Sequence, residues 1–140
     1  MYDYNRYEDR SRFVTDESEI KIYGDCYVPI LNEGGYEIGI FLRKGASEIY
    51  DIKKYIMSLL EHVCELDNIV QKYNSIVYPQ ENDFPFELDC IQIDGPEDIR
   101  LGYDCYLFNT QFDVGFKWIG NRFILKSFGL INNIPEDWDK

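Results

Sequence analysis

The chain has 140 residues and a formal net charge of −12, with 26 acidic side chains against 14 basic ones. Its hydrophobic content of 45%, with 12 Tyr, nine Phe and two Trp, excludes an intrinsically disordered acidic chain, because such chains are poor in aromatic residues. The negative charge opposes binding to nucleic-acid phosphates and anionic lipid heads, so we expect neither nucleic acid nor membrane as a partner. No apolar run approaches membrane-spanning length, and residues 1–7 lack the apolar core of a secretory signal, so we expect a cytoplasmic protein.

The N-terminal part of the sequence predicts a lead-in followed by a β-hairpin. Residues 1–19 are polar and mixed in charge, and we expect them to be loosely held. A single α+β domain is expected over residues 20–140, because this length suits one core. Its first unit is predicted to be an N-terminal hairpin, with extended segments at Ile20–Gly24 and Cys26–Leu31 and a returning strand at Tyr36–Arg43. Gly34-Gly35 supplies the positive φ angles that a two-residue hairpin turn requires.

The clearest periodic pattern in the chain predicts a helix. Apolar side chains recur at alternating steps of three and four residues, at Ile49, Ile52, Ile56, Leu59, Val63, Leu66, Val70 and Tyr73. This spacing places them along one face of an α-helix. Ser47 is a suitable N-cap, and Pro79 follows the end of the pattern. We therefore predict one long amphipathic helix, bent near Asp67-Asn68 and lying on a sheet.

From Phe84 onward the apolar period changes to two, which is typical of β-strands. Alternating segments are separated by turn residues at Gly95–Asp98, Asn109–Gln111 and Gly120-Asn121. The sequence predicts a four-strand antiparallel meander whose apolar face packs against the helix. The last turn would pair Trp118 with Phe123 and Phe116 with Leu125, with all four side chains on one side of the sheet.

The first hairpin of the predicted meander is strongly acidic. Residues 80–104 hold eight acidic side chains and one base, which gives a net charge of −7. If Asp94 lies opposite Ile99, then Asp89 lies opposite Asp104 and Glu87 opposite Tyr106, on the side away from the helix. This register predicts an acidic and aromatic surface. Its candidate partner-binding residues are Glu87, Asp89, Asp94, Glu97, Asp98, Asp104, Tyr106 and Phe108.

Three interpretations of this surface stay open at the level of sequence. The acidic face can serve solubility alone, as in a purely structural or regulatory domain. It can bind a basic protein through charge and aromatic contacts, or a pair of its carboxylates can act in a hydrolase on a neutral substrate. Ile91, Ile93 and Phe108 belong to the interface in the second interpretation. They belong to the core if the N-terminal hairpin covers them.

No spacing of residues in the chain specifies a reaction. His62 is the only histidine, so a site with two imidazole ligands is excluded, and the four cysteines form no CxxC pair. Neither a nucleophile elbow nor a P-loop occurs. We expect a non-enzymatic protein with reduced cysteines, no metal and no cofactor. The sequence does not predict its oligomeric state.

The order of these features resembles a known class of proteins. A small, acidic, tyrosine-rich chain with an early hairpin around Asn32–Gly35, one long helix and a late aromatic meander closed by Trp118–Phe123 is similar to the immunity proteins, and related small α+β families, of bacterial polymorphic toxin systems. The resemblance covers residues 20–130 and carries no diagnostic motif. It implies a cytosolic, non-enzymatic protein that binds and neutralises a basic toxin, and it assigns no site residues.

Overall fold

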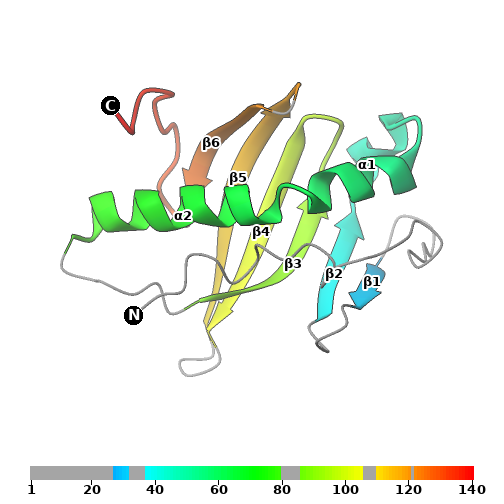
Figure 1. Ribbon diagram of the computed structural model, residues 1–140, viewed down its shortest axis with the longest axis horizontal. Coiled ribbons are helices and arrows are strands. Elements are labelled where there is room, and N and C mark those ends of the chain that lie inside the picture. The colour runs from blue at the N-terminus through cyan, green and yellow to red at the C-terminus, as the bar shows by residue number, and fades with distance from the viewer. Residues whose placement is uncertain (1–26, 32–36, 80–85, 106–109, 121) are drawn as a thin grey trace.

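A single six-stranded sheet, with helices on one face, forms the body of the protein (Figure 1). The computed structural model describes residues 27–31, 37–79, 86–105, 110–120 and 122–140. The strands follow the chain in the order β1-β2-β3-β4-β5-β6. Their bounds are β1 Tyr27–Leu31, β2 Glu37–Leu42, β3 Glu87–Ile93, β4 Asp98–Cys105, β5 Thr110–Ile119 and β6 Arg122–Phe128. Between β2 and β3 the structure has a 3-10 helix η3 (Lys44–Glu48) and two α-helices, α1 (Ile52–Leu60) and α2 (Val63–Val77).

The predicted α+β class and the four-strand antiparallel meander are confirmed. Strands β3 to β6 pair antiparallel with their neighbours in sequence. The register of the last hairpin is the predicted one, since Trp118 pairs with Phe123 and Phe116 with Leu125. Gly120 lies in the turn between them with a φ of 54°, a backbone conformation that glycine adopts without a steric penalty.

The N-terminal strands differ from the separate hairpin that the sequence predicts. β1 pairs antiparallel with β2, but β2 also pairs parallel with β3, so that Gly39 lies opposite Cys90 and Leu42 opposite Ile93. Both strands are thus members of the one sheet and not a unit of their own. The predicted turn at Gly34-Gly35, the segment Ile20–Gly24 and the lead-in over residues 1–19 lie outside the described residues.

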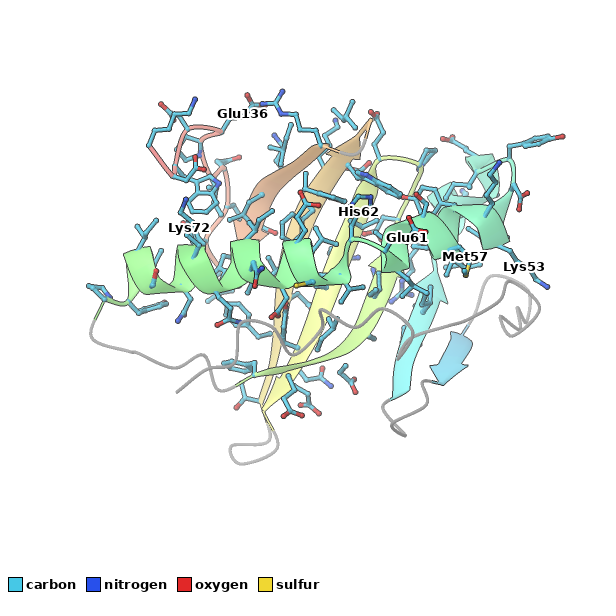
Figure 2. The ribbon with its side chains drawn as sticks, viewed as in Figure 1. Lys53, Met57, Glu61, His62, Lys72 and Glu136 are labelled. Atoms are coloured by element: carbon cyan, nitrogen blue, oxygen red, sulfur yellow. The ribbon has the colours of Figure 1, made fainter. Side chains whose placement is uncertain are left out.

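The single long helix of the prediction is wrong, because the structure has two helices that meet at Glu61 and His62 (Figure 2). At this junction the His62 amide bonds the Leu59 carbonyl at 2.9 Å, and the His62 ring packs against Phe123 with centroids 5.1 Å apart. This tertiary contact coincides with the break, which no glycine or proline marks. α2 continues without interruption through Asp67-Asn68, where the bend was expected.

The start of the helix also differs from the prediction. The N-cap of α1 is Asp51, whose carboxylate accepts the Lys54 amide at 3.2 Å, whereas Ser47 lies within η3. Asp51 satisfies one of the amides that the first helical turn leaves without an intrahelical acceptor.

The predicted apolar stripe is nevertheless the buried face of both helices. The stripe residues that are buried in the core are Ile56, Leu59, Val63, Leu66, Val70 and Tyr73. They share one hydrophobic cluster with buried side chains of the sheet, such as Leu101 and Val114. Asp67 is also fully buried, and the Tyr103 hydroxyl donates a hydrogen bond of 2.7 Å to its carboxylate. This bond ties α2 to β4.

A β-bulge in β3 changes which residues face the helices. Ile93 lies opposite Ile99, one position away from the predicted register, and the pairing shifts again between Leu88 and Cys90. Because the bulge inserts one residue, Leu88 and Ile91 both face the helices, and Cys90 lies on the other face. Ile91 and Ile93 are completely buried, so they are core residues, covered by the helices and not by the N-terminal strands. Phe108 lies outside the described residues.

The bulge predicts a specific role for Gly102, which lies opposite Cys90. A Cβ atom at position 102 would overlap the Cys90 Sγ atom, whereas a Cβ atom at Gly95 would meet nothing closer than 3.9 Å. We expect Gly102→Ala to lower the free energy of unfolding by about 1–3 kcal/mol through overpacking, and Gly95→Ala to have a much smaller effect. Urea unfolding measures both. Cys90→Ala should restore most of the stability in the Gly102→Ala background, and a double variant as unstable as the single one would contradict the assigned overlap.

Candidate functional site

The face of the sheet opposite the helices, here called the outer face, carries most of the candidate residues. In β3 and β4 its side chains include Glu87, Gln92, Arg100 and Asp104, because they alternate with the buried positions Leu88, Ile91, Leu101 and Tyr103. In β5 the same alternation places Asp113 and Lys117 on this face, opposite Gly102 and Asp98. The outer face therefore brings together charges from strands that are distant in sequence.

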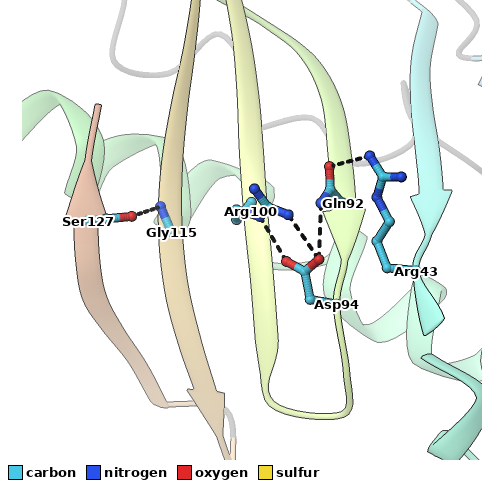
Figure 3. Close-up of polar contacts among 6 residues, drawn as sticks. All are labelled: Arg43, Gln92, Asp94, Arg100, Gly115 and Ser127. Carbon is cyan, nitrogen blue, oxygen red and sulfur yellow. Dashed lines mark hydrogen bonds and ion pairs between the residues drawn. The ribbon is translucent and has the colours of Figure 1, made fainter. Parts of the chain in front are cut away.

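A chain of hydrogen bonds crosses the outer face from β2 to β4 (Figure 3). The Arg43 guanidinium donates to Gln92 Oε1 at 3.2 Å, and Gln92 Nε2 donates to Asp94 Oδ1 at 3.0 Å. Arg100 then donates to both oxygens of Asp94, at 2.8 and 3.0 Å. This bidentate geometry is the strongest form of an arginine–carboxylate pair.

Asp94 is therefore used inside the protein, although the sequence predicts it to bind a partner. Partial burial acts to raise its pKa, but the hydrogen bonds from Arg100 and Gln92 and the positive charge of Arg100 outweigh this effect and hold the pKa of Asp94 below its ordinary value. Asp94 stays ionised and paired at neutral pH. Both oxygens of its carboxylate accept hydrogen bonds from side chains of β3 and β4, beside the turn between these strands.

One end of the outer face, here called the acidic end, is formed by Glu87, Asp89, Asp104 and Asp113. Glu87 lies directly opposite Asp104, where the prediction had placed Asp89, and Asp89 occupies the bulge. Asp113 comes from β5, two residues along from Gln111, which is the partner of Asp104. Glu87, Asp89 and Asp113 are exposed, and Asp104 is partly buried. Three of the predicted binding residues thus lie in one part of the outer face, in a register different from the expected one.

The carboxylates of the acidic end affect the pKa of the Cys90 thiol. Burial raises the pKa of the Cys90 thiol to about 11, and the negative charges of Asp89, Asp113 and Asp104 add to this effect. The thiol is therefore protonated and poorly reactive at neutral pH. Three carboxylates act together on one atom, which shows that their fields overlap.

The other predicted residues are placed elsewhere or not described. Glu97 and Asp98 lie at the turn between β3 and β4, at the opposite end of the hairpin, and both are exposed. Asp98 pairs in register with Lys117, so its charge has a basic neighbour. Tyr106 and Phe108 lie outside the described residues. The aromatic part of the predicted surface stays a prediction.

Asp113 is not among the binding residues predicted from the sequence, although the alternating pattern of β5 indicates which face it lies on. Phe112, Val114 and Phe116 alternate on the face that packs against the helices, which places Asp113 on the outer face by period two alone. Its proximity to the acidic hairpin depends on the pairing of β4 with β5.

The described residues give no support to metal binding or hydrolysis at the acidic end. There, no three His, Cys, Asp or Glu side chains are grouped closely enough to hold a metal ion. Two pockets, of about 500 and 440 Å³, are lined by residues of the helices and the turns beside them, and neither is lined by Glu87, Asp89 or Asp104. These pockets therefore give no support to carboxylate-dependent hydrolysis at the predicted surface.

No protein-family model, curated protein or solved structure matches the chain. Among the described residues no helix is both long and apolar enough to cross a membrane.

The paired Asp94 predicts a defined pH dependence. Because its pKa is lowered in the folded protein, ionised Asp94 stabilises the fold above the unfolded-state pKa of about 3.9, and this contribution is lost as the pH falls through the folded-state pKa. A double-mutant cycle with Asp94→Asn and Arg100→Gln, measured by urea unfolding, should give a coupling free energy of at most about 1 kcal/mol at pH 6, since the pair is partly exposed. The coupling should shrink towards zero at pH 2. A coupling that stays constant over this range would show that the charge of Asp94 is not its source.

Proposed function

We propose that the chain is a non-enzymatic, cytoplasmic protein that binds a basic protein through the acidic end of its outer face. The observation that carries the proposal is the separation of charge on this face. Among the described residues of this face, the carboxylates of Glu87, Asp89, Asp104 and Asp113 gather at one end, whereas Arg100 and Lys117 lie at the other end beside Asp94 and Asp98. A field of one sign on a rigid surface attracts a partner of the opposite sign and orients it.

The position of Glu87 opposite Asp104 supports a binding role over solubility alone. Like charges directly across a ladder destabilise a sheet, and a solubilising surface has no need to place them there. Lysine or arginine side chains of a partner would relieve this repulsion on binding. The cost in the free protein is then part of the driving force for association.

The resemblance to immunity proteins points to the same class of partner. In such proteins an acidic surface covers a basic toxin, often a nuclease. The size, the charge, the α+β class and the late aromatic meander of this chain agree with that comparison. We therefore propose a toxin, encoded by a neighbouring gene, as the basic partner.

Co-expression with the product of the neighbouring gene tests the proposal. A complex should co-purify, and its dissociation constant should rise between 50 and 200 mM NaCl because salt screens the charges. The triple variant Glu87→Gln/Asp104→Asn/Asp113→Asn should bind at least about tenfold more weakly, mainly through slower association.

A matched control variant removes the same number of negative charges from another part of the surface. The variant Glu61→Gln/Glu136→Gln/Asp137→Asn removes three exposed carboxylates away from the acidic end and should bind like the wild type. The triple variant at the acidic end should be at least as stable as the wild type, since it removes like-charge repulsion. Equal loss of binding in both variants, or no complex at all, would contradict the proposal.

A further inference from the structure

Arg100 lies between two carboxylates of the outer face, those of Asp94 and Asp113. Its guanidinium donates hydrogen bonds of 2.8 and 3.0 Å to the two oxygens of Asp94 (Figure 3). These hydrogen bonds and the negative charges of Asp94 and Asp113 raise the pKa of Arg100, although partial burial opposes them. Both carboxylates therefore act on one cation, and Asp94 is the one that is hydrogen-bonded to it.

The strand register places Asp113 within reach of the Arg100 side chain. Arg100 on β4 lies opposite Gly115 on β5, and Gly102 lies opposite Asp113, so Arg100 and Asp113 are diagonal neighbours on the outer face. Diagonal positions of an antiparallel pair are about 7–8 Å apart, a distance that a long side chain spans. The other two corners of this square are glycines, so no side chain of β4 or β5 stands between the two charged groups.

Contacts at the two glycines place both charged side chains beside this square. A Cβ atom on Gly115 would lie 3.9 Å from Arg100 Cγ, and a Cβ atom on Gly102 would lie 3.7 Å from Asp113 Oδ1. Asp113 is exposed, and its carboxylate forms no ion pair within the described part of the chain. A guanidinium released from Asp94 therefore finds an acceptor at Asp113 by side-chain rotation alone.

Asp94 has a structural advantage over Asp113 in binding Arg100. Gln92 Nε2 donates a hydrogen bond of 3.0 Å to Asp94 Oδ1, which orients the carboxylate for the bidentate contact with the guanidinium. Asp113 is exposed and would lose rotamer freedom on pairing. Because exposed ion pairs are weak, one substitution is enough to reverse the preference of Arg100.

We infer that Asp94 is a positioning residue that sets the charge of the acidic end. By holding the guanidinium of Arg100 beside the turn between β3 and β4, it leaves Asp113 open to a cationic side chain of the partner. Without the charge of Asp94, Arg100 pairs with Asp113 and neutralises one carboxylate of the acidic end. This role rests on the proposed function, and it identifies Arg100 as the internal competitor of the basic partner.

The thiol of Cys90 reports the exchange in the absence of any partner. Burial and the charges of Asp89 and Asp113 raise its pKa, so pairing of Asp113 with a cation lowers this pKa and increases the thiolate fraction. In Asp94→Asn we expect iodoacetamide at pH 8 to alkylate Cys90 about two- to fivefold faster than in the wild type. Mass spectrometry of the Cys90 peptide measures the rate, and Cys64 on α2 should react at an unchanged rate.

Two further variants make the alkylation test specific for Arg100. The double variant Asp94→Asn/Arg100→Gln removes the cation that moves, so its Cys90 should react no faster than that of the wild type. Glu97→Gln removes an exposed carboxylate from the same turn without releasing Arg100, and should also leave the rate unchanged. An unchanged rate in Asp94→Asn, or an equal increase in the double variant, overturns the inference.

Binding to the basic partner tests the consequence for the proposed function. Asp94→Asn should weaken the complex by up to about fivefold, the effect of pairing one exposed charge. The double variant Asp94→Asn/Arg100→Gln has the net charge of the wild type and should bind at least as tightly as the wild type. Faster alkylation without a change in affinity overturns the role of Asp94 in binding. Absence of any complex overturns the proposed function, and the alkylation result is independent of it.

Discussion

The parallel pairing of β2 with β3 is the constraint on which the rest of the structure depends. Parallel neighbours cannot be joined by a tight turn, so the chain must cross from one end of the sheet to the other, and here η3, α1 and α2 lie in that crossover. The helices cover one face (Figure 1). Most large apolar side chains of the meander are drawn to that face, which leaves mainly polar and charged residues on the other face.

The bulge at Asp89 then decides what the outer face contains. It lets Leu88 and Ile91 both enter the core, and it places Cys90 outward beneath Gly102, among the carboxylates that raise its pKa. Without the extra residue, the apolar pattern of β3 would put Ile91 and Ile93 towards solvent. One inserted residue thus completes the core and sets Glu87 opposite Asp104.

The charges of the outer face serve two different purposes. At the acidic end, charge concentrated on rigid strands gives long-range attraction at the cost of repulsion in the free protein. The chain of hydrogen bonds from Arg43 to Arg100 instead stabilises the fold, because it pairs the negative charge of Asp94 with a cation and connects the end of β2 with β3 and β4.

The sequence by itself determined the features that depend on local pattern. The apolar stripe of the helices, the strands of the meander and the register across the turn at Gly120 follow from periodicity and turn chemistry, and so does the presence of Glu87 and Asp104 on one face. Only the tertiary structure decided the break at His62, the bulge at Asp89, the pairing of Asp94 with Arg100 and the position of Asp113 beside the acidic hairpin. These features depend on contacts between residues that are distant in sequence or on opposite strands, where a shift of one residue exchanges the two faces of a strand.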